Sequence, residues 1–293
     1  MSVVITGATG HLGRLVVESL LEAGTPADDI VATGRDAAKL EQVGSRGVTT
    51  RRVDFADLAP LEAAFAGAES LLLVSTTTVG ERFANHRRAI DAARAGGVKQ
   101  LVYTSSLNAA TARMRLAEEH RRTEEYLRES GIPFVILRNG WYLENYTGQL
   151  PLIRQHGVLL GSARDGAVSA ASRRDYADAA AVALTQTGHE GATYELGGEP
   201  FTLSDLAATI GEELGTHITY RDLPVAAYAE ALTGAGLPAE MATVLADADA
   251  GLARGELYTD SDDLPRLIGR AATTHRDAVR AALAHGSVSP TSA

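Results

Sequence analysis

A glycine-rich turn between the first apolar run and the first amphipathic stretch constrains the fold more than any other feature. Residues 2–6 read SVVIT, an expected strand, and residues 11–24 read HLGRLVVESLLEAG, an expected helix. A helix N-terminus offers unpaired N–H groups and a positive dipole to a pyrophosphate. Glycines allow the tight turn, the close backbone approach and the helix–strand packing. The alternative is a turn that binds no ligand, but the strand–turn–helix context favours a dinucleotide site. Its residues are Gly7, Ala8, Thr9, Gly10, His11, Leu12 and Gly13.

The first half of the chain alternates short apolar runs with amphipathic segments. Buried strands joined by crossover helices are typical of a parallel sheet with right-handed connections. The pattern predicts an α/β protein with a doubly wound parallel Rossmann sheet. The six expected strands cover residues 2–6, 29–35, 49–55, 70–76, 100–106 and 133–141.

The alternation of apolar runs and amphipathic segments ends after about residue 150. Residues 192–222 read as a strand–helix–strand unit, and most of the remaining chain reads as helix. We expect a dinucleotide-binding domain over 1–150 and a smaller, mostly helical region over 151–286 that packs on it and forms the substrate side of a cleft. Residues 287–293 are expected to form a flexible tail.

The end of the second expected strand indicates which dinucleotide binds. Arg35 stands where an NAD site usually has a carboxylate, and a guanidinium suits a 2′-phosphate by charge and geometry. This favours NADPH (NADP), although Asp36 could still reach a ribose and Arg35 could be a solvated loop charge. Asp54 and Phe55, at the end of the third strand, are placed to flank the adenine. Ser75, Thr76 and Thr77, at the end of the fourth strand, lie at the carboxyl edge where such cofactors bind.

Composition excludes several other kinds of function. The net charge of −10 argues against a nucleic-acid partner. The absence of cysteine excludes disulfides and thiolate chemistry, and the histidines lack metal-ligand spacing, so we expect no metal. No apolar run is long enough for a membrane helix, and the first residues lack the features of a secretory signal. We therefore expect a cytoplasmic protein that does not enter a membrane.

Several stretches resemble known proteins. The opening loop and the strand order resemble the short-chain dehydrogenase/reductase superfamily. The stretches LLLVSTTTVGERFANHRRAIDAARAGGVKQLVYTSSLNA, LAEEHRRTEEYLRESGI, LRNGWYLENY and HEGATYELGG narrow the resemblance to the atypical NmrA-like group. Within it they most resemble the bacterial type 2 NADPH:quinone oxidoreductases. The resemblance covers nearly the whole chain and is most specific over residues 138–146.

The resemblance implies roles for individual residues. It places the pyrophosphate at residues 7–12, the 2′-phosphate at Arg35 and the cofactor's edge at residues 75–77. It also implies a quinone as the small-molecule substrate and a possible homodimer. The residues expected on the nicotinamide side are Asn139, Gly140, Trp141, Tyr142, Leu143 and Glu144, with Ala171 beside them.

The usual catalytic pair of the superfamily is absent. Its members pair a Ser at the end of the fifth strand with a Tyr-x-x-x-Lys on the next helix. Ser105 is in place, but the only lysines, Lys39 and Lys99, lie upstream of that helix, which instead has His120 and Glu124 at i, i+4 spacing.

Alcohol dehydrogenation by the usual route is therefore not expected. Direct hydride transfer to a quinone needs mainly stacking geometry, so catalysis by position is the leading hypothesis.

Three candidate catalytic residues follow, and alternatives remain open. His120 could donate a proton, or it could be a helix-surface residue. Ser105 retains its place at the strand end, and Tyr142, with Trp141, could form a stacking wall or simply pack in the core. A different class of function, a non-catalytic NADP(H)-binding redox sensor, fits the missing pair equally well. Reduction of another electrophile is a third alternative.

Overall fold

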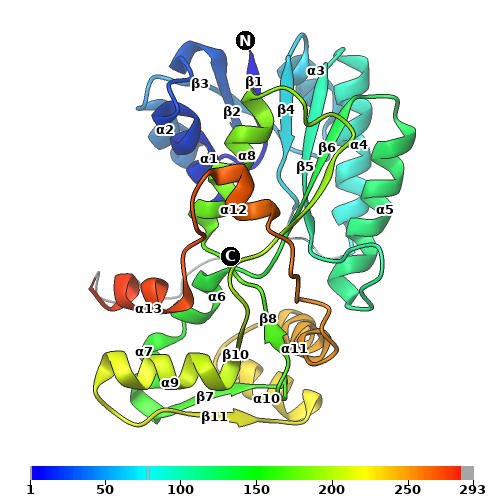
Figure 1. The fold of residues 1–293 in the computed structure, drawn as a ribbon. Coiled ribbons are helices and arrows are strands. Elements are labelled where there is room, and N and C mark those ends of the chain that lie inside the picture. The colour runs from blue at the N-terminus through cyan, green and yellow to red at the C-terminus, as the bar shows by residue number, and fades with distance from the viewer. Residues whose placement is uncertain (1, 77, 79, 285–293) are drawn as a thin grey trace.

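The protein is built on one central, all-parallel sheet. The computed structural model describes residues 2–76, 78 and 80–284. Seven strands in the order β3-β2-β1-β4-β5-β6-β9 form the sheet, which confirms the predicted fold class (Figure 1). Their bounds are β1 Val3–Ile5, β2 Ile30–Gly34, β3 Thr49–Arg52, β4 Ser70–Leu73, β5 Gln100–Ser106, β6 Phe134–Asn139 and β9 Thr193–Leu196.

The strand order reverses direction at β1. The chain passes from β1 to β2 and β3 on one side and then returns to β4 on the other side of β1. In doubly wound sheets the crevice at such a switch point, outside the carboxyl ends of the strands, is where ligands bind. The topology therefore predicts a ligand site among the residues that follow β1, β2, β4, β5 and β6.

Helices cover both faces of the sheet because its strand residues alternate between two apolar cores. On β5, Leu101 and Tyr103 face one core and Val102 faces the other. The core containing Val102 is completed by α1 (His11–Glu22), α2 (Ala37–Gly44), α8 (Arg173–Thr185) and α12 (Asp263–Ile268). The opposite core is completed by α3 (Leu58–Phe65), α4 (Arg82–Ala95) and α5 (Arg115–Glu129) (Figure 1).

A third core organises a smaller lobe at the end of the sheet where β6 leads into α6 (Figure 1). In this lobe β7 pairs with β11 in parallel, and β8 pairs with β10 in antiparallel orientation. The lobe contains α6 Leu143–Thr147, α7 Leu150–His156, β7 Val158–Gly161, β8 Ala167–Val168, β10 Phe201–Thr202, α9 Leu203–Leu214, β11 Thr219–Asp222, α10 Val225–Gly234, α11 Ala239–Ala253 and α13 His275–Ala284. The short 3-10 helix η1, Ala27–Asp29, precedes β2.

The division at residue 150 does not separate the sheet from the lobe. Three segments of the expected 151–286 region return to the sheet: α8 and α12 pack on its face, and β9 pairs with β6 as a seventh strand. The expected strand–helix–strand unit over 192–222 is split, because β9 joins the sheet whereas β11 pairs with β7. The pattern of a strand does not encode its partner, which explains the difference. The expected tail, 287–293, lies outside the described residues.

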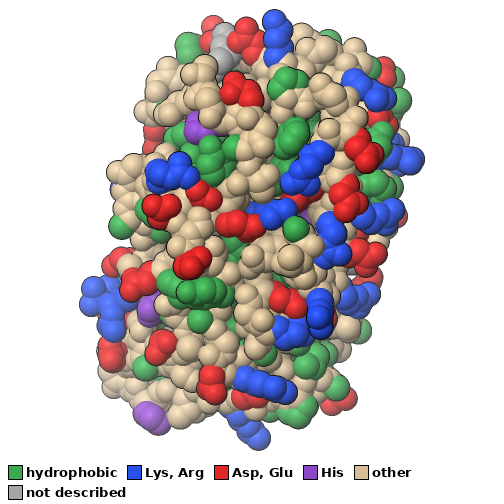
Figure 2. Space-filling view, turned by 45° about the vertical axis from the view of Figure 1, so that its right-hand side comes forward, with side chains coloured by type: hydrophobic (Ala, Val, Ile, Leu, Met, Phe, Trp, Pro, Cys, Tyr) green, Lys and Arg blue, Asp and Glu red, His purple; other side chains and the backbone are tan. Residues whose placement is uncertain are grey.

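The surface carries both signs of charge. On the face shown in Figure 2, acidic and basic side chains are interspersed over the sheet half and the lobe. Within the described part of the chain, no helix is both long enough and apolar enough to cross a membrane.

Candidate active site

The turn between β1 and α1 has the geometry expected of an anion site. Gly7 has φ +62°, in the left-handed region, and a Cβ on Gly13 would lie 2.4 Å from the Gly7 carbonyl oxygen. The α1 helix begins after Gly10 with no side-chain cap and no acidic residue in its first turn. Its first N–H groups and positive dipole are therefore left for a ligand. Ala8 is buried, and its N–H donates to the Thr33 carbonyl at 2.9 Å.

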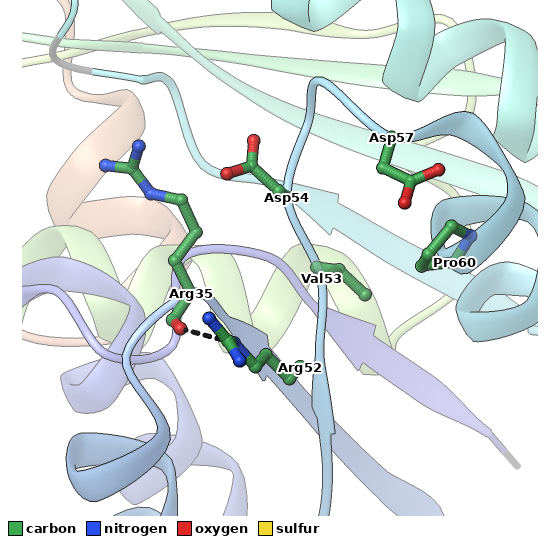
Figure 3. Close-up of a pocket in the computed structure, with 6 residues that line it drawn as sticks. All are labelled: Arg35, Arg52, Val53, Asp54, Asp57 and Pro60. Carbon is green, nitrogen blue, oxygen red and sulfur yellow. Dashed lines mark hydrogen bonds between the residues drawn. The ribbon is translucent and has the colours of Figure 1, made fainter.

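A pocket of about 270 Å³ lies at the carboxyl ends of β2 and β3 (Figure 3). Arg35 is exposed there, and Arg52 Nε donates to the Arg35 carbonyl at 3.1 Å. Asp36 Oδ1 instead accepts from Lys39 N at 3.1 Å and caps α2, so this carboxylate already has a structural role. The pocket thus carries two guanidinium groups near its mouth. It is lined by Arg35, Arg52, Val53, Asp54, Asp57 and Pro60.

Asp54 and Phe55 have different surroundings. Asp54 lines the pocket while its Oδ1 accepts from Ala56 N at 2.9 Å. Phe55 packs against the core formed with α3, α4 and α5, and its carbonyl accepts from Arg88 Nε at 2.7 Å. Asp54 is therefore the member of this pair that borders the pocket, and the adenine-flanking role of both residues remains a prediction.

The segment after β4 is held by side-chain acceptors from neighbouring elements. Val74 N donates to Thr6 Oγ1 and Ser75 N donates to Thr104 Oγ1, each at 2.9 Å. Thr76 follows, and its own hydroxyl is buried without a hydrogen-bond partner. Thr77, the third residue predicted here, lies outside the described residues.

Unpaired polar atoms continue along the same edge of the sheet. Ser106 Oγ, at the end of β5, and both polar atoms of the Asn139 amide, at the end of β6, are buried without partners. Together with Thr76, which lies just beyond β4, they stand at the carboxyl edge of three adjacent strands. A buried polar group left unpaired costs about 1–3 kcal/mol, so such groups usually have a partner that the protein alone does not supply. This row indicates a polar ligand along the edge.

The residues after β6 close one side of this edge. A Cβ on Gly140 would lie 2.5 Å from the Ser169 carbonyl oxygen, so the backbone passes close to the segment before α8. Tyr142 forms an isolated parallel bridge with Ala171, and Leu143 N donates to the Ala171 carbonyl at 3.0 Å. Ala171 thus lies beside the 139–144 segment, and its contact with the cofactor remains a prediction. Leu143 is buried, and Trp141 packs against the core of the lobe.

Arg173, at the start of α8, contacts the segment that follows β6. Its guanidinium lies 4.8 Å from the centre of the Tyr142 ring, and its backbone N–H donates to Glu144 Oε1 at 2.9 Å. Burial, followed by the positive charge of Arg173, lowers the pKa of His11 in the first turn of α1. The positive charge of Arg173 thus acts on the first turn of α1. Burial also raises the pKa of Tyr142, so its hydroxyl stays protonated.

Ser105 does not face the site as predicted. Its Oγ donates to Glu124 Oε1 at 2.6 Å. The same carboxylate accepts hydrogen bonds from Arg138, from Nε to Oε1 at 2.9 Å and from Nη2 to Oε2 at 2.6 Å. Burial raises the pKa of Glu124, but the hydrogen bonds from Arg138 and Ser105 outweigh it and hold that pKa below its ordinary value. Because this ion pair holds the Ser105 hydroxyl, the structure argues against its predicted catalytic role.

His120 is neither a surface residue nor a group at the carboxyl edge. Its ring is buried beside the middle of β5, where Tyr103 OH lies 2.7 Å from His120 Nδ1. Burial, with the nearby Arg82 charge, lowers the pKa of His120 well below its ordinary value. The ring is therefore uncharged at neutral pH and carries no imidazolium proton, which corrects the prediction of a proton donor.

Among the described residues, no group of three His, Asp or Glu side chains could hold a metal ion. Sequence reasoning missed four residues that the structure brings to this edge or its support. Arg52 and Arg173 stand beside other charged residues, a pattern typical of solvated surface. Ser106 follows Ser105, which occupies the position of the superfamily's catalytic serine. His86, which contacts Thr76, gave no motif signal. The missed residues are Arg52, His86, Ser106 and Arg173.

Comparisons with known proteins agree with this geometry. Residues 7–187 match the model of a family described as NAD(P)H-binding. The chain is 46% identical to quinone oxidoreductase 2 of Escherichia coli over 278 residues, which cover 94% of this chain and 97% of the relative. It is 30% identical to an NmrA-like family domain-containing oxidoreductase of Aspergillus flavus, across 96% of this chain and 94% of the relative.

A solved structure gives the same result in three dimensions. The crystal structure of an NADPH-dependent quinone oxidoreductase from Escherichia coli, complexed with NADPH, superposes with a TM-score of 0.93. Its sequence is 45% identical, and the match covers 96% of this chain and 99% of that chain.

The buried, uncharged His120 predicts a pH dependence of folding. The pKa of His120 is lower in the folded than in the unfolded protein. Its contribution to the free energy of unfolding is therefore complete above pH about 6.5 and is lost as the pH falls below that value. We expect His120→Gln to reduce the pH slope of the unfolding free energy between pH 6 and pH 5 by up to about 1.4 kcal/mol per pH unit. Urea unfolding at each pH measures this. His156→Gln, at an exposed histidine, is the control, and equal slopes for all three proteins would contradict the account.

Proposed function

Because the chain belongs to the NAD(P)H-binding, NmrA-like family, we propose that it is an NADPH-dependent reductase that passes a hydride to a quinone. One observation carries the cofactor part of this proposal. Unpaired polar atoms end β4, β5 and β6 on one side of the α1 N-terminus, and two guanidinium groups end β2 and β3 on the other. A dinucleotide is a ligand long enough to use both halves of such an edge.

The pyrophosphate would lie at the start of α1. The glycines bring the backbone close, and the uncapped helix supplies N–H groups and the positive end of its dipole. Arg173 stands near this helix end and would add a positive charge. These groups oppose the net charge of −10 on the protein, which would otherwise repel an anionic cofactor.

The pocket at β2 and β3 would select the 2′-phosphate. Arg35 is exposed at its mouth, and Arg52 adds a second guanidinium to the lining. Asp36, the residue that could have favoured a ribose hydroxyl, is held by the α2 N-terminus. This charge arrangement supports a preference for NADPH over NADH.

The nicotinamide half would lie along the ends of β4, β5 and β6. Thr76, Ser106 and Asn139 offer the unpaired hydroxyl and amide groups there. The Tyr142 ring, fixed between the Arg173 guanidinium and the Tyr176 ring, would form a wall on this side. When bound, the nicotinamide supplies the hydride, and these residues orient it and exclude water.

The site offers few side chains that could transfer a proton, which supports a hydride acceptor that needs little acid catalysis. Ser105 is held by Glu124, and His120 is buried and uncharged, so neither replaces the missing Tyr–Lys pair. A quinone is strongly electrophilic, and its oxygens can take protons from water after hydride transfer. Rate would then come mainly from the placement of donor and acceptor. The similarity to quinone oxidoreductase 2 supports the same choice of substrate.

The activity has a direct test. We expect the purified protein to oxidise NADPH when simple benzoquinones or naphthoquinones are added, with a rate that saturates in quinone and is higher with NADPH than with NADH. Loss of nicotinamide absorbance measures it. Tight NADPH binding without turnover on any quinone would instead support a redox sensor.

The role of the guanidinium pocket is tested separately. We expect Arg35→Ala to lower kcat/KM for NADPH by about 10- to 100-fold, which is the effect of losing a charged hydrogen bond. The kcat/KM for NADH should change little. Arg46→Ala is the matched control, because Arg46 is also exposed and pairs with Glu18 on α1. Equal effects of Arg35→Ala on NADPH and NADH would contradict the 2′-phosphate assignment.

A further inference from the structure

Both backbone polar groups of Thr76 are hydrogen-bonded to side chains. Thr76 N donates to His86 Nε2 at 3.0 Å, and the Thr76 carbonyl accepts from Arg82 Nε at 2.8 Å. Both partners come from α4, and both are buried. The Thr76 hydroxyl, in contrast, has no partner. The backbone is therefore fixed while the side chain remains free to bind a ligand.

The bond from Thr76 requires one tautomer of His86. Because Nε2 accepts a hydrogen bond, the neutral ring must carry its hydrogen on Nδ1. Thr123 Oγ1 lies 3.1 Å from that nitrogen and is free to accept, since its own hydrogen is donated to the Glu119 carbonyl at 2.8 Å. Thr123, on α5, thus selects the tautomer that Thr76 needs.

A second pair of buried groups supports the same arrangement. Tyr103 OH lies 2.7 Å from His120 Nδ1 and 3.4 Å from His86 Nδ1. If Tyr103 donates to the nearer nitrogen of His120, its oxygen can accept from His86, which again places the hydrogen on His86 Nδ1. The Tyr103 ring also packs edge-on against His86, with ring centres 5.3 Å apart.

The charges around His86 keep it neutral. Burial, and then the Arg82 charge, lower the pKa of His86 to about 3. Glu119, whose carbonyl accepts from Thr123, has its carboxylate occupied by Arg82 at 3.7 Å and by the N–H groups of Gly80 and Phe83 at 3.0 and 3.2 Å. A protonated ring would direct an N–H at the Thr76 N–H, so the neutral form is the one that fits.

We propose that His86 is a positioning residue for the nicotinamide half of the site. Held in its Nδ1–H tautomer by Thr123, it fixes the Thr76 backbone so that the Thr76 hydroxyl faces the bound dinucleotide. The inference rests on the proposed NADPH-dependent function and deepens it, because it names a side chain outside the site on which the site's geometry depends. His86 acts through Thr76 and does not itself touch the cofactor.

Two ligands separate positioning from general damage. NADPH would occupy the whole edge, whereas 2′,5′-ADP carries only the adenosine half with its 2′-phosphate and would use the Arg35 pocket on the far side of β1. We expect His86→Leu to weaken NADPH binding by about 10- to 100-fold, as for a buried donor left unpaired, and to leave 2′,5′-ADP binding unchanged. Calorimetric titration of each variant gives both dissociation constants.

A conservative variant and a matched pair complete the experiment. His86→Gln keeps an acceptor near the position of Nε2 and should restore most of the NADPH affinity. Thr123→Val removes the hydroxyl that selects the His86 tautomer and should weaken NADPH by about 3- to 10-fold. Thr209→Val is its control, because Thr209 Oγ1 also lies 3.1 Å from a histidine, His275 Nε2, but in the lobe.

The outcomes are distinguishable. Weaker NADPH binding with unchanged 2′,5′-ADP binding in His86→Leu, or in Thr123→Val if the leucine variant does not fold, supports the proposal. Equal losses for both ligands, no loss for either, or the same loss in Thr209→Val would overturn it. If the unaltered protein binds neither ligand, the proposed function itself fails and the inference with it.

Discussion

The hydrogen bonds that hold the chain just beyond β4 are the interaction on which the site depends. A parallel strand ends at the sheet edge with backbone amides that its neighbours no longer pair, and each buried amide needs an acceptor. Here side chains supply the acceptors: threonines from the ends of β1 and β5, and His86 from α4. The backbone just beyond β4 is therefore hydrogen-bonded without any ligand, and a fixed backbone is what catalysis by position requires.

The same edge leaves other polar groups unpaired. Thr76, Ser106 and Asn139 present buried hydroxyl and amide groups without partners, although polar groups elsewhere on these strands are bonded to one another. Around the rest of the edge, the α1 N-terminus offers the positive end of its dipole, and Arg35 and Arg52 line the pocket beside Asp54 and Asp57. A hydrogen-bonded backbone, unpaired polar side chains and guanidinium groups together describe a site for an anionic, hydrogen-bonding ligand rather than a folding defect.

Local patterns predicted the sheet and the turn after β1, because a strand, a glycine turn and a helix are each encoded over a few residues. Contacts between distant residues were not predictable in this way. Glu124 on α5 accepts a hydrogen bond from the Ser105 hydroxyl and is itself paired with Arg138 on β6, and nothing near Ser105 signals this. The strand β9 pairs with β6 from beyond the expected boundary, and His86 meets Thr76 only once α4 packs on the sheet.

A dinucleotide that binds along the carboxyl edge from β3 to β6 would protect backbone amides there. Hydrogen–deuterium exchange with and without NADPH measures this protection along the whole edge at once. We expect slower exchange in peptides covering the β1–α1 turn, the segment that follows β4 and the segment from Asn139 to Glu144, with little change around β7 and β11. Slower exchange confined to the lobe, or no change at saturating NADPH, would contradict it.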